Sequence, residues 1–296
     1  MESISWSTED WLPHPEGERC AGSSGDGKLD GERRDTYDER SVFTFDWSPE
    51  PGREVAGVGT FDGRVVIVTG AARGLGRDYA RFFARDGASV VLADVKDTEK
   101  AAADAGGDSI GVETDVTSRD SIRAMMRLTE ERFGRLDILI NNAGLWRDMN
   151  EGGLLNCPDD IWERGWAVNL TGTLRCYQEA VPLMAKNRWG RIVNISSQAA
   201  RFGGSVYGLT KHTVEHMTMG MAREVGDLGI TVNCVAPGIC AFEAATEQLP
   251  TADSIVANNA IKRMGTTRDL YGAISFLCSP AGDWVTGQTV HVDGGA

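Results

Sequence analysis

Short apolar runs alternate with longer segments of helical character from Arg64 to the C-terminus. The runs are Val65–Val68, Val90–Leu92, Ile138–Ile140, Ile192–Ile195, Ile230–Val235 and Thr289–Val292. They are rich in β-branched residues and apolar throughout rather than alternating, which is typical of strands covered on both faces. The helical segments between them include Leu75–Arg85, Ser121–Phe133, Trp162–Met184 and Val206–Val225. Repeated β-α units predict an α/β fold, a doubly wound parallel sheet with helices on both faces.

The sequence divides into two parts of different character. Residues 1–60 contain 14 acidic and 6 basic side chains, many glycines and serines, and no sustained helical or strand period. We predict an irregular or partly disordered acidic extension there. Its aromatic residues also fit a strap that anchors on the globular body, and both interpretations stay open; these residues are Trp6, Trp11, Phe43, Phe45 and Trp47. Residues 61–296 are expected to form one domain, with a substrate lid near residues 239–264.

Composition excludes several functional classes. The net charge is −13 and neither part of the chain carries a basic stripe, so we expect no nucleic-acid partner. No apolar run is long enough to cross a bilayer, and residues 1–10 lack the basic and apolar regions of a secretory signal. Six scattered cysteines without CxxC spacing read as reduced thiols. We therefore predict a cytoplasmic protein with no membrane partner.

A glycine-rich turn follows the first predicted strand directly and opens the first predicted helix. Its residues are Thr69-Gly70-Ala71-Ala72-Arg73-Gly74-Leu75-Gly76. Glycines permit a tight turn and a close approach of backbone to a pyrophosphate, while the helix N-terminus offers free N–H groups. The strand-turn-helix context predicts a Rossmann-type dinucleotide site.

An acidic residue at the end of the second strand bears on which dinucleotide is bound. Asp94 lies 18 residues beyond Gly76, near the ~20 expected for the acid that binds the adenosine ribose hydroxyls. A carboxylate there repels a 2′-phosphate and favours NAD over NADP, whereas Arg73 in the glycine loop is the contrary sign. Asp115 and Val116 follow the third strand, where adenine is expected; Asp115 fits equally well as a cap for the next helix.

Tyr207 and Lys211 are spaced i, i+4 and share one face of the helix predicted at Val206–Val225. A tyrosine with a pKa of ~10 is a poor base at neutral pH. A cation about 4 Å away in a medium of dielectric about 20 contributes around 4 kcal/mol, enough to lower that pKa by roughly three. The pair is therefore a candidate for general acid–base catalysis.

Several motifs occur in a fixed order along the chain. The glycine loop is followed by Asn141-Asn142-Ala143-Gly144 after the fourth strand, Ser196-Ser197 after the fifth, and then Tyr207 with Lys211. In this order the sequence resembles the short-chain dehydrogenase/reductase family, from about Gly63 to the C-terminus. The resemblance implies an oxidoreductase that moves a hydride between NAD(H) and a secondary alcohol or its ketone, and a homo-oligomer, tetramer or dimer, built through the helices around the catalytic strand.

The resemblance assigns roles to individual residues. Tyr207 is the acid/base, Lys211 lowers its pKa and holds the nicotinamide ribose, Ser197 binds the substrate oxygen, and Asn169 holds a water of the proton relay. The expected cofactor-binding set is Gly70, Arg73, Gly74, Leu75, Gly76, Asp94, Asp115, Val116, Asn142, Ala143, Gly144, Tyr207, Lys211, Pro237, Gly238 and Ile239. The expected substrate pocket contains Trp146, Gln198, Phe202 and Phe242, with Arg147 and Arg201 nearby.

The sequence departs from the family pattern at two places. Tyr207 stands ten positions after Ser197, about three fewer than the family usually has, so either Ser196 or Ser197 faces the substrate. Phe242 stands five residues after Pro237, where the family often has threonine, which gives the pocket an aromatic wall.

Other functional hypotheses stand beside the NAD-dependent one. The segment 212–216 fits the HxxEH pattern of some zinc peptidases, but it follows Lys211 on the same helix, and we predict no metal site. An NADPH-dependent ketoreductase, for instance one acting on 3-oxoacyl thioesters, is the second candidate. A non-catalytic dinucleotide-binding sensor is the third.

Overall fold

The computed structural model describes residues 61–146, 149, 153–202, 204–241 and 256–296. Contacts divide the chain into Met1–Pro51 and Gly52–Ala296, and all the described residues belong to the second unit. The acidic extension at residues 1–60, with its aromatic residues, lies outside the described residues, as do Arg147 and Phe242. Its predicted irregular or strap-like character stays a prediction.

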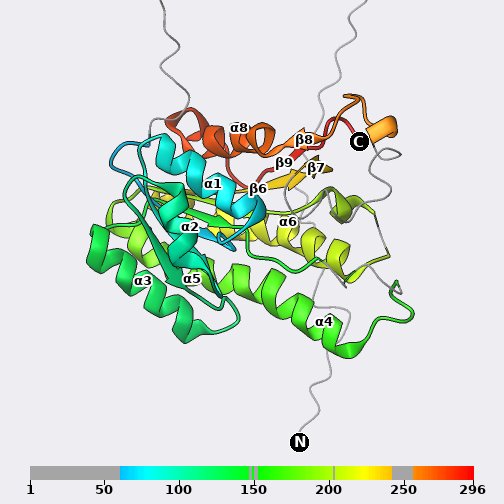
Figure 1. Ribbon diagram of the computed structural model, residues 1–296, viewed down its shortest axis with the longest axis horizontal. Coiled ribbons are helices and arrows are strands. Elements are labelled where there is room, and N and C mark those ends of the chain that lie inside the picture. Colours follow the sequence, from blue (N-terminus) through cyan, green and yellow to red (C-terminus); the bar gives the residue numbers. More distant parts are fainter. Residues whose placement is uncertain (1–60, 147–148, 150–152, 203, 242–255) are drawn as a thin grey trace, which may run out of the picture. The chain divides into compact units, whose positions relative to one another are not determined.

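Seven parallel strands form the central sheet in the order β3-β2-β1-β4-β5-β6-β9 (Figure 1). The strands are β1 (Val65–Thr69), β2 (Ser89–Asp94), β3 (Ser109–Glu113), β4 (Ile138–Asn141), β5 (Gly190–Ile195), β6 (Ile230–Pro237) and β9 (Thr289–Val292). The chain runs outward from β1 to β3 and then returns to place β4 on the other side of β1. Ligands of open α/β sheets bind at the carboxyl ends of the strands beside such a reversal, here β1 and β4.

Helices cover both faces of this sheet (Figure 1). The helices are α1 (Gly74–Arg85), α2 (Thr98–Ala105), α3 (Arg119–Phe133), α4 (Asp159–Gly165), α5 (Thr173–Lys186), α6 (Val206–Val225) and α8 (Thr267–Cys278). One core contains buried side chains of α1, α2 and α8 against the sheet, and a second contains those of α3, α5 and α6. The predicted α/β fold is confirmed.

The burial pattern explains why the strands lack polar alternation. All residues of β1, β4, β5 and β6 are buried, because each of these strands has a helix layer on both sides. Asp137 precedes β4 and is also fully buried. It accepts hydrogen bonds from the guanidinium groups of Arg64 and Arg135 and from the backbone N–H of Val65. These bonds compensate for placing a carboxylate at the edge of the core.

The helical segment predicted at Trp162–Met184 is divided in the structure. A π-helix, η1 (Trp166–Gly172), connects α4 to α5. Periodicity alone did not separate these pieces, because a π-helical insertion as short as η1 shifts the apolar spacing over only a few residues. Single turns of π-helix are frequent at functional sites, and this one contains Asn169.

A small two-stranded sheet stands apart from the main one. Strand β7 (Cys240–Ala241) pairs in parallel with β8 (Gly265–Thr266). The two strands bracket residues 242–264, which form most of the segment expected to cover the substrate. Short 3₁₀ turns occur at η2 (Gln198–Arg201), η3 (Gly226–Leu228) and η4 (Pro280–Gly282). No helix within the described ranges combines the length and apolar character needed to cross a membrane.

Candidate active site

The glycine loop between β1 and α1 is shaped to accept a phosphate. Gly70 and Gly74 adopt positive φ angles of 64° and 59°. A Cβ on Gly76 would lie 2.3 Å from the carbonyl oxygen of Gly70, so only a hydrogen fits there. Helix α1 has no side-chain cap at Arg73 and no acid in its first turn, so no side chain caps its N-terminal N–H groups. This arrangement fits the pyrophosphate of a dinucleotide.

Asn142 fixes the loop from the neighbouring strand. Its amide Nδ2 donates to the carbonyl oxygens of Thr69 (2.9 Å) and Gly70 (3.0 Å). The hydroxyl of Thr69 in turn accepts from the backbone N–H groups of Asn142 and Ala143. The predicted cofactor residues after β4 are therefore brought to the glycine loop, and the side chain of Asn142 holds the shape of that loop.

Asp94 lies at the end of β2 beside the same loop. Its Oδ2 accepts from the backbone N–H of Ala72 at 3.0 Å and its Oδ1 from that of Val95 at 2.7 Å. The half-buried carboxylate is thus aimed at the loop, where an adenosine ribose would lie. Arg73 is exposed.

Asp115 and Val116 follow β3 and differ in environment. The carboxylate of Asp115 accepts from the N–H and the hydroxyl of Thr117, which forms a local turn, and Ser118 caps α3 instead. Val116 is buried against η1, where a Cβ on Gly172 would lie 2.8 Å from its Cγ2. Asp115 therefore forms the turn that precedes the helix cap and does not cap the helix itself, which was the second interpretation of this residue.

Tyr207 lies in the first turn of α6, and its side chain lies beside that of Ser197. The two side chains lie close enough for Ser197 to affect the phenol electrostatically. Burial raises the pKa of Tyr207, and Ser197 acts in the opposite direction. Ser197 is therefore a direct neighbour of the candidate acid/base residue.

Ser196 points elsewhere. Its hydroxyl is buried and donates to Oε1 of Glu215 at 2.7 Å, two turns beyond Tyr207 on α6. Of the two serines, Ser197 and not Ser196 thus lies beside Tyr207, and its role toward a substrate stays a prediction. Ser196 instead joins β5 to α6.

Three residues allow the shortened path from Ser197 to Tyr207. Gly204 has a φ of 100°, which only glycine adopts readily. Ser205 caps α6, and its hydroxyl accepts from the N–H of Gly208 at 3.0 Å. A Cβ on Gly208 would lie 2.6 Å from the carbonyl oxygen of Ala199, so glycine permits η2 to pack directly on the helix. Sequence reasoning did not identify Ser205 and Gly208, although a serine immediately before a helical segment is a capping signal.

Lys211 is buried one turn beyond Tyr207. Its Nζ donates to the carbonyl oxygen of Ile195 at 2.7 Å and lies 5.7 Å from the centre of the Tyr207 ring. Burial lowers the pKa of Lys211 to about 8. The pair shares one helix face as predicted, while a lowering of the Tyr207 pKa by Lys211 stays a prediction.

Asn169 approaches the same centre from η1. Its buried side chain donates to the carbonyl of Leu145 and to the hydroxyl of Thr210, and it accepts from the N–H of Leu145. A Cβ on Gly144 would lie 3.3 Å from Lys211 Nζ and 3.4 Å from Asn169 Oδ1. Glycine at this position thus keeps a narrow space between the two polar side chains.

The remaining predicted residues of the site differ in how deeply they are buried. Pro237 and Ile239 are buried, and Gly238 packs so closely that a Cβ would lie 2.5 Å from Cα of Asp293. Of the predicted pocket residues, Trp146 and Gln198 are half-buried, whereas 59% of Phe202 is exposed. Leu75 of the glycine loop is half-buried as well.

Two further side chains considered from the sequence have other partners. Arg201 donates to Oδ2 of Asp293 at 3.1 Å, which ties η2 to the C-terminal segment. His212 and His216 are both exposed on α6, and Glu215 between them accepts from Ser196. Among the residues described, no group of three or more histidine, cysteine or acidic side chains is arranged to hold a metal ion.

Comparisons with known proteins agree with this geometry. Residues 70–296 match the family described as enoyl-(acyl carrier protein) reductase. An uncharacterized oxidoreductase of Mycobacterium tuberculosis is 42% identical over 79% of this chain and 98% of its own length. A 3-oxoacyl-[acyl-carrier-protein] reductase of Staphylococcus aureus is 35% identical over 77% of this chain and 96% of its own.

A solved structure and a further relative extend the comparison. A short-chain dehydrogenase/reductase mutant of Serratia marcescens superposes with a TM-score of 0.73 at 32% identity, covering 80% of this chain and 98% of that one. A (2S)-[(R)-hydroxy(phenyl)methyl]succinyl-CoA dehydrogenase subunit of Thauera aromatica is 36% identical over 78% of this chain and 96% of its own length. The chain is a short-chain dehydrogenase/reductase, an oxidoreductase that uses a nicotinamide dinucleotide.

Proposed function

We propose that the protein interconverts a secondary alcohol and its ketone with NAD(H), and that Tyr207 is the acid/base. The observation that carries this proposal is the grouping of Ser197 and Tyr207 with the buried Lys211, whose Nζ lies 5.7 Å from the centre of the Tyr207 ring. All three follow strand β5, next to the reversal in strand order where the glycine loop lies. A cofactor held on that loop is expected to reach this group.

The proposed chemistry divides between cofactor and chain. A nicotinamide held on the glycine loop would supply the hydride chemistry, as acceptor in the oxidation and as donor in the reduction. In the oxidation, Tyr207 Oη takes the proton of the alcohol hydroxyl, and the C=O bond forms as the hydride leaves. Ser197 donates to the same oxygen and fixes its position. In the reduction, Tyr207 returns the proton to that oxygen.

Lys211 and Asn169 support the tyrosine in this proposal. The Lys211 ammonium favours the phenolate electrostatically when it is charged, because opposite charges in a buried site attract strongly. Asn169 lies on the other side of Gly144, where the narrow space suits a proton path to Lys211. Both side chains are nearly inaccessible to solvent.

NAD rather than NADP is favoured by the environment of Asp94. Its carboxylate is fixed by two backbone N–H groups beside the glycine loop, so it cannot easily turn away from a 2′-phosphate. Parallel fluorescence titrations with NADH and NADPH test this, on wild-type protein and on Asp94→Ala. We expect tighter NADH binding in the wild type and a relaxed preference in the variant. NADPH preference in the wild type would contradict the assignment and give Arg73 the deciding role.

A second candidate function is supported by the names of relatives. The Staphylococcus aureus protein is named for 3-oxoacyl groups on acyl carrier protein, and the Thauera aromatica protein for a hydroxyacyl-CoA. Thioesters with an oxygen on the third carbon are therefore the first substrate class to screen, in both directions and with both cofactors. If a simple secondary alcohol is oxidised faster than every thioester, the result favours the general alcohol–ketone proposal over a thioester substrate.

Location and assembly stay predictions from the sequence. We expect a cytoplasmic homo-oligomer, a tetramer or dimer, associating through α5 and α6. The outer surface of these helices supports this expectation, since Met219 is 42% exposed beside Met217 and Leu174 in a hollow of about 560 Å³. Light scattering of the purified chain measures the assembly directly.

A further inference from the structure

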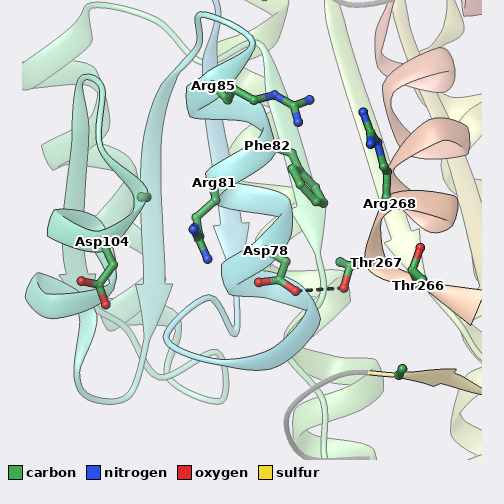
Figure 2. Close-up of a pocket in the computed structure, with 10 residues that line it drawn as sticks. Asp78, Arg81, Phe82, Arg85, Asp104, Thr266, Thr267 and Arg268 are labelled. Atoms are coloured by element: carbon green, nitrogen blue, oxygen red, sulfur yellow. Dashed lines mark hydrogen bonds between the residues drawn. The ribbon is translucent and has the colours of Figure 1, made fainter.

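A groove of about 550 Å³ lies between α1 and α8 (Figure 2). It is not part of the catalytic centre described above. Ala241 of β7 and Thr266 of β8 contribute to its lining, so it reaches the small sheet that brackets residues 242–264. The remaining lining residues are Asp78, Arg81, Phe82, Arg85, Asp104, Ala105, Thr267 and Arg268.

Two arginines from different helices converge in this groove. Figure 2 shows the guanidinium groups of Arg85 on α1 and Arg268 on α8 directed toward one another, with the ring of Phe82 between the helices. The Arg85 guanidinium lies 5.1 Å from the centre of that ring, and its Nε forms an ion pair with Oδ1 of Asp86 at 2.8 Å. Its two terminal nitrogens remain for another acceptor. Among the described residues, Arg268 has no hydrogen-bond or ion-pair partner.

The acidic side chains of the groove are already engaged. Asp78 accepts from the hydroxyl of Thr267 at 2.8 Å, the contact drawn in Figure 2. Asp104 accepts from Lys100 at 2.7 Å on α2. Arg81 adds a third guanidinium to the lining. The lining thus contains three guanidinium groups and two carboxylates, in a chain whose net charge is −13.

Converging guanidinium groups are suited to a particular ligand chemistry. Two like charges repel each other, and an anion placed between them removes that repulsion. The planar fork of arginine donates two parallel hydrogen bonds to a phosphate group. A carboxylate is a weaker match for two forks from opposite walls, because it offers two oxygens where a phosphate offers three or more.

We propose that this groove binds the phosphate group of an organic phosphate through Arg85 and Arg268. Which molecule carries this phosphate group is an inference that rests on the proposed function. The phosphate belongs either to a coenzyme-A-type thioester whose acyl end is the substrate, or to a free organic phosphate. Figure 2 shows the two guanidinium groups beside the C-terminal end of α1, at a distance from Thr266 of β8.

Binding is tested by calorimetry on the full chain saturated with NADH, so that the dinucleotide site is already filled. Coenzyme A and inorganic pyrophosphate are the probes. We expect both to bind wild-type protein, and Arg268→Gln and Arg85→Gln each to weaken both by about tenfold or more. Arg127→Gln is the matched control, because Arg127 is an exposed arginine on α3, far from the groove in sequence and on the opposite face of the sheet. Equal affinities in wild type and all three variants, or no binding by wild type, would overturn the proposal.

Kinetics then distinguish the two sources of phosphate. A 3-oxoacyl-CoA is compared with the same acyl group on N-acetylcysteamine, which carries no phosphate. If the groove holds the substrate's phosphate, Arg268→Gln raises KM for the CoA thioester about tenfold and leaves kcat and the KM of the short thioester unchanged. If the KM for the CoA thioester is equal in wild type and variant while pyrophosphate binding still depends on the arginines, the result supports a free organic phosphate as the ligand of the groove. Arginine-dependent binding without turnover of either thioester supports the site and counts against the thioester as substrate.

Discussion

Replacing Gly76 by alanine tests whether the glycine loop is shaped by close backbone packing. The new Cβ would lie 2.3 Å from the carbonyl oxygen of Gly70 and 2.4 Å from Nδ2 of Asn142. Atoms in ordinary contact need about 1 Å more, so the loop or the amide must move. Neither is free to do so, because Asn142 Nδ2 bonds both Thr69 and Gly70.

The expected cost follows from that overlap. Overpacking of this kind destabilises proteins by about 1–3 kcal/mol. In a domain of this size we expect the thermal midpoint to fall by roughly 3–10 °C. Displacing the Gly70 carbonyl also moves the N–H groups that would meet the pyrophosphate, so the dissociation constant of NADH should rise at least about tenfold.

A second glycine supplies the control. Gly272 lies on α8 and is exposed, and a methyl group added to its Cα would have no heavy atom within 4 Å outside its own helix backbone and chain neighbours. Gly272→Ala should stabilise the helix by about 0.5–1 kcal/mol and leave NADH binding unchanged. Thermal denaturation and NADH fluorescence titration on both variants measure these effects. Wild-type NADH affinity in Gly76→Ala would refute the assignment of the loop as the phosphate cradle.

Two further predictions concern the catalytic centre. Because burial lowers the pKa of Lys211 to about 8 from 10.5, the unfolded chain binds more protons at this residue between those values. The unfolding free energy of wild type, relative to that of Lys211→Met, should therefore rise by about 3 kcal/mol as the pH increases across that window. Chemical denaturation at several pH values measures both free energies. A difference between the two proteins that does not change with pH would contradict the lowered pKa of Lys211. Ser197→Ala should lower kcat by about 10²-fold or more with little loss of stability. Ser196→Ala should instead cost about 1 kcal/mol of stability and retain most of kcat; the reverse outcome would reassign the two serines.

The sequence was sufficient for features that depend on local spacing. The glycine turn between a buried strand and a helix, the acid at the end of β2 and the Tyr207–Lys211 spacing all lie within single β-α units. Helix α6 occupies Val206–Val225, as predicted from its apolar period. These features need no knowledge of distant contacts.

Features that arise between distant segments were not accessible in the same way. The orientation of Ser196 depends on Glu215, 19 residues away on a packed helix. The π-helix around Asn169 interrupts a segment whose apolar period reads as one helix. The arginine groove combines Arg85 with Arg268, which only the packing of α8 against α1 brings together. Helices α2 and α8 were not distinguished as separate elements either.

Turnover by Tyr207→Phe is the most direct test of the central claim. The substitution removes one hydroxyl, and NADH titration of the same variant verifies that the cofactor site is intact. We predict that kcat falls by about 10²–10⁴-fold while the NADH dissociation constant stays near that of wild type. Turnover equal to wild type would contradict the role of Tyr207 as the acid/base.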